Sequence, residues 1–126
     1  MRILLLSLAL VAGLSACSSD GGAEIVMTDT RRYEPATLTV AVGETVTWRN
    51  ESREAHSVTA VEASLPDGAD YFSSGGYGSE DAARDHLENL MTADETYSVE
   101  FARAGTYEYF CIPHEDQGMK GRIIVE

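Results

Sequence analysis

Four side chains of this sequence (one cysteine, two histidines and one methionine) are of the types that bind copper. Cys111, His114 and Met119 follow one another with the spacing C-x2-H-x4-M, and His56 lies far upstream. Two imidazoles and a thiolate form a trigonal set around copper, and a thioether adds a weak axial ligand. Such a set suits both Cu(II) and Cu(I), so an electron can move with little rearrangement of the ligands. The pattern predicts a copper site that transfers single electrons and is not an enzyme.

Each of these residues has an ordinary structural explanation when it is taken alone. A histidine often satisfies polar neighbours, a methionine fills a core, and a cysteine behaves as a small buried hydrophobe. A structural zinc site is disfavoured because a thioether is a poor zinc ligand. A cysteine enzyme built on Cys111 and His114 would leave Met119 without a role. The order and spacing of all four side chains therefore favour copper.

A copper storage or delivery protein is the alternative to an electron carrier. A protein that hands over its metal needs accessible, exchangeable ligands, often additional methionines or a second cysteine at the site. The only other cysteine is Cys17, which lies in a quite different sequence context. The composition therefore favours the electron carrier.

Short strands must position the ligands. Seven segments are rich in Val, Thr, Tyr and Ile and alternate with a period of two; they are residues 24–28, 37–42, 45–49, 56–61, 96–102, 106–111 and 121–125. The pairs Gly43-Glu44 and Ala104-Gly105 indicate tight turns between antiparallel strands. Long helices do not alternate with these strands, which disfavours a parallel α/β sheet. The sequence predicts an all-β fold, an antiparallel Greek-key β-sandwich.

One segment, residues 79–91, has helical character instead. Ser79 suits a helix N-cap, and the acidic Glu80 and Asp81 suit the positive end of the helix. The apolar residues of the segment fall on one face, namely Ala83, Leu87, Leu90 and Met91. The segment predicts one short surface helix packed on the sandwich. His86 lies beside this apolar face and is interpreted as a surface or packing residue, not as a ligand.

The first residues have the features of an export signal. Residues 1–16 consist of a basic N-terminus followed by an apolar run that is too short to span a bilayer. The run ends in Leu-Ser-Ala-Cys17, which resembles the bacterial lipobox, whose cysteine is lipidated after cleavage; cleavage without lipidation is the alternative. We expect a signal peptide over residues 1–16, a lipidated flexible tether over 17–23 and a copper-binding domain over 24–126. Cys17 would then anchor the protein to the periplasmic or extracellular face of a membrane.

The chain of 126 residues is strongly acidic and has the length of one domain. Twenty-one Asp and Glu against nine Lys and Arg give a formal net charge of −12, which argues against nucleic acid as a partner. An acidic surface suits either a salt-rich habitat or docking of a basic redox partner, and charge alone does not separate the two. We expect a monomer whose partners are redox proteins, an electron donor and an acceptor.

From Glu24 to Glu126 the chain resembles the plastocyanin and halocyanin branch of the cupredoxins. The stretches that carry the resemblance begin at Tyr33 (YEPA, then LTV), Gly43 (GETVTWRN), His56 (HSV) and Tyr107 (YEYFCIPH, then MKG). The resemblance implies a cupredoxin-like sandwich with one type 1 (blue) copper ion. It also implies that His56, Cys111, His114 and Met119 are the ligands and that His114, near the surface, is the electron port.

Two neighbours of the ligands bear on this resemblance. Ser57 stands where the family often has Asn, and its backbone N–H can still approach the ligand sulfur. Phe110 precedes Cys111 and is interpreted as a packing aromatic of a strand rather than as a contact on an electron path.

Overall fold

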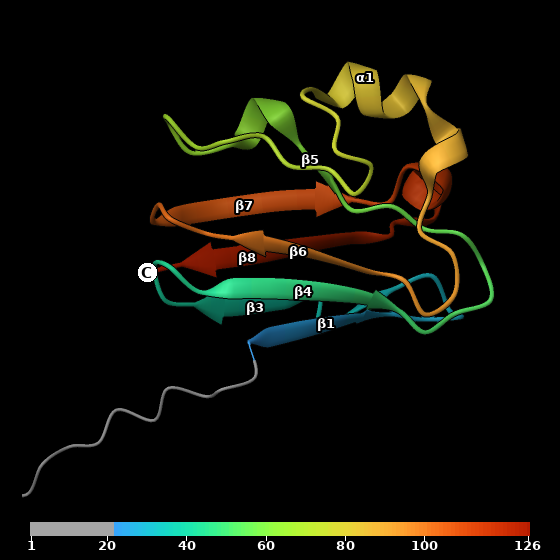
Figure 1. The fold of residues 1–126 in the computed structure, drawn as a ribbon. Coiled ribbons are helices and arrows are strands. Elements are labelled where there is room, and N and C mark those ends of the chain that lie inside the picture. The colour runs from blue at the N-terminus through green and yellow to red at the C-terminus, as the bar shows by residue number, and fades with distance from the viewer. Residues whose placement is uncertain (1–21) are drawn as a thin grey trace, which may run out of the picture.

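The protein is described by a computed structural model that covers residues 22–126, so the predicted signal peptide and residues 17–21 of the predicted tether lie outside the described residues. Two four-stranded sheets face one another (Figure 1). The first sheet has the order β2-β1-β4-β6, made of Tyr33–Glu34, Ala23–Met27, Thr45–Asn50 and Thr96–Glu100. The second has the order β3-β8-β7-β5, made of Thr37–Val40, Lys120–Val125, Gly105–Phe110 and Thr59–Ala60. Within residues 22–126, no helix has the length and apolar character needed to cross a membrane.

The predicted β-sandwich is confirmed, but its sheets are mixed rather than wholly antiparallel. β1 runs parallel to β4, and β3 runs parallel to β8. The turns at Gly43 and Gly105 connect strands of different sheets, so the two hairpins predicted there are wrong. The physical reason is that Val40 and Val46, on either side of the first turn, both enter the core, each from its own sheet.

The core between the sheets is built around Trp48. Along β4, Val46 and Trp48 are fully buried while Thr45 and Thr47, which alternate with them, face away from the core, as the predicted period-two alternation requires. The Trp48 ring meets Tyr109 of the opposite sheet edge-on, with 5.3 Å between ring centroids. Such aromatic pairs bury large apolar areas, so they hold the two sheets in a fixed relation.

The predicted helix is present but shorter than expected. Ser79 caps α1 (Glu80–Asp85) by accepting a hydrogen bond from the backbone N–H of Ala82. The chain leaves the helix at His86 and makes a 3-10 turn over Leu87–Asn89. Two further 3-10 turns span Glu62–Ser64 and Ile112–Gln117. In Figure 1, α1 lies beside β5, at the edge of the second sheet.

The last residue of the predicted helix belongs to a β-bridge instead. The backbone of Met91 exchanges two hydrogen bonds with that of His56, at 3.0 and 2.8 Å. This long-range pairing prevails over the helical spacing of the apolar residues. It fixes the backbone of one of the predicted ligands.

Candidate metal centre

Three of the predicted ligands converge in one buried cluster. The ligand atoms of His56, Cys111 and His114 all lie within 4.8 Å of one another. The two Nδ1 atoms are 3.0 Å apart, and Cys111 Sγ lies 3.6 Å from that of His56 and 3.4 Å from that of His114. Nitrogen and sulfur ligands about 2.0–2.3 Å from a shared ion lie roughly 3.0–3.7 Å from one another when the angles at the ion are between about 95° and 120°. The three atoms therefore fit around a single metal ion.

The β7–β8 connection presents three of the four side chains. Cys111 directly follows β7, Met119 directly precedes β8, and the 3-10 turn over Ile112–Gln117 carries His114 between them. Gly118 closes the turn in the left-handed conformation (φ 77°), which glycine adopts without steric cost. Met119 is buried, with 1% of its surface exposed. The four predicted side chains are thus arranged as a type 1 copper site: a thiolate and two imidazoles would surround the ion, and the backbone of the buried Met119 is hydrogen-bonded to Cys111 and to His114.

Ser57 holds the sulfur ligand in place. Its backbone N–H points at Cys111 Sγ across 3.4 Å, as the sequence predicts for this position. Its hydroxyl oxygen accepts a hydrogen bond from the N–H of Ile112 at 2.9 Å, and its carbonyl accepts one from the Tyr33 hydroxyl at 2.6 Å. The residue that follows the first histidine therefore ties the ligand loop to β2.

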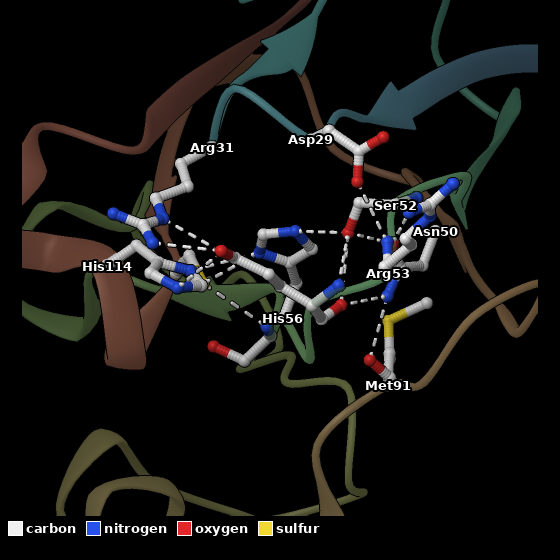
Figure 2. Close-up of polar contacts among 11 residues, drawn as sticks. Asp29, Arg31, Asn50, Ser52, Arg53, His56, Met91 and His114 are labelled. Atoms are coloured by element: carbon white, nitrogen blue, oxygen red, sulfur yellow. Dashed lines mark hydrogen bonds and ion pairs between the residues drawn. The ribbon is translucent and has the colours of Figure 1, made fainter.

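The outer nitrogens of both imidazoles also have partners, which sequence reasoning missed. His56 Nε2 lies 2.7 Å from Ser52 Oγ, and His114 Nε2 lies 3.2 Å from a carboxylate oxygen of Glu54. Arg31 donates to both oxygens of that carboxylate, each at 2.8 Å. Figure 2 shows the two rings, with Ser52 beside His56 and Arg31 on the side of His114. The only sequence signal is a short polar segment just upstream of a histidine, which is typical of many surface loops.

Burial shifts the ionisation of the ligands in the metal-free protein. It lowers the pKa of His56 and of His114, so both imidazoles are neutral near pH 7. It also raises the pKa of the Cys111 thiol, in spite of the hydrogen bonds from Ser57. A metal ion binds the thiolate and so must displace this proton.

Two further residues behave as the sequence predicts. His86 lies outside the cluster: its ring stacks on Tyr77 with 5.0 Å between centroids, and its Nδ1 lies 2.8 Å from the carbonyl oxygen of Ala82. Phe110 is a packing aromatic with 3% of its surface exposed, and the Arg84 guanidinium lies 4.6 Å from the centre of its ring.

Arg84 explains the contact between helix α1 and the ligand loop. It donates to both carboxylate oxygens of Glu115 at 2.7 and 3.1 Å, and to Glu80 of its own helix at 3.0 Å. Phe110 precedes one ligand and Glu115 follows another, so a single side chain of α1 contacts both flanks of the site.

Comparison with known proteins agrees with this geometry. The family model described as copper binding proteins, plastocyanin/azurin family, matches residues 22–126, which include all four predicted ligands. The chain belongs to this family. Among curated proteins, this cupredoxin is 39% identical over 94 residues to a plastocyanin of Scenedesmus fuscus, covering 75% of this chain and 86% of that protein. It is 34% identical over 111 residues to a plastocyanin of Lactuca sativa, covering 86% and 93% of the two chains.

Solved structures show the same relationship. This cupredoxin matches a Cu(I) form of an amicyanin variant with a TM-score of 0.62 and 32% identity, covering 88% of each chain. A purple cupredoxin from Nitrosopumilus maritimus, 20% identical, shares the fold with a TM-score of 0.61. The predicted membership in the blue copper cupredoxins is confirmed, and the protein is an electron-transfer copper protein of that family.

Proposed function

We propose that this cupredoxin carries single electrons between two redox proteins, with one copper ion held by His56, Cys111 and His114 and axially by Met119. The observation that carries the proposal is the convergence of two Nδ1 atoms and one sulfur in a buried site, with the backbone of the buried Met119 hydrogen-bonded to Cys111 and His114. Bound copper supplies a one-electron couple between Cu(II) and Cu(I).

The chain's own residues keep the site closed and rigid. His56 and Cys111 are fully buried, and Met119 is 1% exposed, so water is kept from these ligands. His114 is 9% exposed and is the ligand nearest to solvent. Because backbone pairing and hydrogen bonds hold each ligand, the donor atoms need not move when the charge of the site changes. The exposed edge of His114 is therefore the place where an electron would enter and leave.

The same burial weighs against the alternative of copper storage or delivery. A delivery protein must release its ion to another set of ligands, which requires access to the ion. Here the backbone N–H of Ser57 is directed at Cys111 Sγ, and the ligand loop closes over the site. These features favour retention of the ion.

The tether and the partners are part of the proposal. We expect Cys17 to carry a lipid that anchors the protein on the extracytoplasmic side of a membrane, as its lipobox-like context suggests. The partners are redox proteins, and the net charge of −12 favours basic ones. Mass spectrometry of the protein from a bacterial membrane fraction tests the anchor, with Cys17→Ser as the control that should appear in the soluble fraction. An unmodified Cys17 in the membrane-free fraction would contradict this part.

Addition of Cu(II) to the purified protein tests the electron carrier itself. The expected result is an intense blue absorption band with narrow copper hyperfine splitting in the EPR spectrum, followed by reversible one-electron reduction. A pale, tetragonal Cu(II) signal, or no binding, would overturn the proposal.

A further inference from the structure

The loop between β4 and His56, residues 51–55, contacts the outer nitrogen of both ligand imidazoles. Ser52 Oγ lies 2.7 Å from His56 Nε2, and Glu54 Oε2 lies 3.2 Å from His114 Nε2. We propose that Ser52 and Glu54, here called the ring brace, fix the orientation of both imidazole rings. We also propose that the charge of Glu54 lowers the reduction potential of the site. The proposal rests on the proposed function, because a potential is defined only for a copper-loaded protein.

A count of hydrogens around Ser52 shows which nitrogen of His56 carries the proton. Ser52 Oγ is a buried hydroxyl with one hydrogen. It lies 2.8 Å from Asn50 Oδ1 and 3.0 Å from the carbonyl oxygen of Glu54, and neither of these oxygens can donate. The hydroxyl hydrogen therefore goes to one of them, and the 2.7 Å contact with the ring is made by an N–H on His56 Nε2. His56 Nδ1 is left with a free lone pair that faces both Cys111 Sγ, at 3.6 Å, and His114 Nδ1, at 3.0 Å. The single hydrogen of the Cys111 thiol can satisfy one of the two nitrogens, whereas a bound metal ion would satisfy both.

Asn50 holds the brace in place. Its amide group donates to the carbonyl oxygens of Glu54 and Met91, both at 2.9 Å. Its side-chain oxygen accepts from the backbone N–H of Ser52 at 2.9 Å. Because Asn50 is fully buried and Met91 is paired with the backbone of His56, the loop and the ligand form one connected unit (Figure 2).

Glu54 favours the same protonation state at His114 as Ser52 does at His56, but it also carries a negative charge. The Glu54 carboxylate oxygen lies 3.2 Å from His114 Nε2, and its negative charge favours a proton on that nitrogen, which leaves Nδ1 free to bind metal. A carboxylate on the outer nitrogen of a ligand imidazole makes the imidazole a stronger donor, which stabilises Cu(II) more than Cu(I). Arg31 neutralises part of this charge through its two bonds to Glu54. The two residues should therefore affect the potential with opposite signs.

Two substitutions separate the charge from the packing. Glu54→Gln keeps an oxygen that can accept from His114 and removes the charge. We expect it to weaken Cu(II) binding about tenfold relative to Cu(I), which is a rise of about 59 mV in the reduction potential. Arg31→Gln should lower the potential, because it leaves the charge of Glu54 uncompensated. Glu51→Gln is the matched control: Glu51 lies on the same loop, pairs with Arg49 and should leave the potential nearly unchanged.

The protonation pattern is tested without copper. Nitrogen-15 NMR of the metal-free protein should show His56 and His114 with the proton on Nε2. Ser52→Ala should produce a mixture of the two neutral forms at His56, and Glu54→Ala should do so at His114. Ser64→Ala, at an exposed serine whose hydroxyl donates to the carbonyl of Val61, is the control that should change neither spectrum.

The outcomes distinguish failure of the brace proposal from failure of the proposed electron-transfer function. A wild-type protein without a blue site would refute the proposed function. The NMR experiment would still show whether Ser52 and Glu54 orient the two rings. A blue site whose potential moves equally in Glu54→Gln and Glu51→Gln would overturn the effect of the Glu54 charge. A shift of the same sign in Glu54→Gln and Arg31→Gln would indicate loosening of the loop and would also overturn it. Wild-type histidines with the proton on Nδ1 would overturn the orienting role.

Discussion

The backbone N–H of Cys111 donates a hydrogen bond to the carbonyl oxygen of Met119 across 3.0 Å. The residues that begin and end the ligand loop are thus paired directly beyond the β7–β8 ladder, whose last pair joins Phe110 and Lys120. Because the backbone of both residues is fixed by the sheet, a change of either side chain should alter the chemistry of the site and leave the loop in place.

Replacing the sulfur ligand should remove the colour. Cys111→Ser is expected to abolish the intense blue band, because that band arises from charge transfer from sulfur to copper. Absorption spectra after addition of Cu(II) measure the effect, with circular dichroism to establish that the variant is folded. Cys17→Ser is the control and should keep the full band; a blue Cys111→Ser protein would show that another group supplies the sulfur or the band.

Replacing the axial residue should leave the colour and change the potential. Met119→Leu conserves volume, so we expect a loss of less than about 1.5 kcal/mol in the free energy of unfolding. Loss of the weak thioether donor favours Cu(I), so the reduction potential should rise. Voltammetry measures it, with Met27→Leu, at a fully buried methionine of β1, as the control. A lowered potential in Met119→Leu would mean that Met119 is not the axial ligand.

The metal-free protein should lose stability in mild acid. Burial holds the pKa of His56 and of His114 below the ordinary value of 6.5. Below about pH 6.5 the unfolded chain therefore binds protons that the folded protein does not, so the free energy of unfolding falls as the pH drops. Above that pH both states are neutral and the two histidines contribute no slope.

Urea unfolding of the metal-free protein at several pH values between 7.5 and 5.5 measures this slope. The double variant His56→Gln/His114→Gln should have a smaller slope than the wild type over the same range. A wild-type protein that becomes more stable on acidification through this range would contradict the direction of both pKa shifts.

Removing Arg84 should detach helix α1 from the ligand loop. Arg84→Ala loses the ion pairs with Glu80 and Glu115 and the contact with the Phe110 ring, which together contribute about 1–2 kcal/mol to the free energy of unfolding. Chemical denaturation measures the loss. Arg122→Ala is the matched control, since its pair with Glu108 is longer, at 3.4 Å, and more exposed. Equal losses in the two variants would show that the contacts of Arg84 are worth no more than an ordinary surface pair.

The predictions that succeeded rest on local patterns. The alternation of Val46 and Trp48 tells which side chains face the core, and the pattern of Cys111, His114 and Met119 is contained in one loop. Alternation tells which face of a strand is buried but does not tell which strand lies beside it. The parallel pairing of β1 with β4 and the crossing between sheets at Gly43 therefore escaped prediction.

The predictions that failed or were missing concern contacts between distant segments. Met91 has helical spacing with Ala83 and Leu87, but its backbone pairs with His56 far away in the sequence. The contact of Glu54 with His114, like that of Arg84 with Glu115, joins segments that carry no shared motif. Such contacts are decided by the packed fold, because a charged residue in a loop has no sequence signal for its partner.

The position of β8 between β3 and β7 has a consequence for the order in which the protein matures. β3 and β8 are far apart in the sequence, and pairing of such distant segments is slow because a long loop must first close. Until β8 pairs with β7, the backbone of Met119 is not held beside that of Cys111. The complete set of four ligands therefore comes together only once β8, the last strand, has paired, and a chain still lacking β8 would not hold copper in this site.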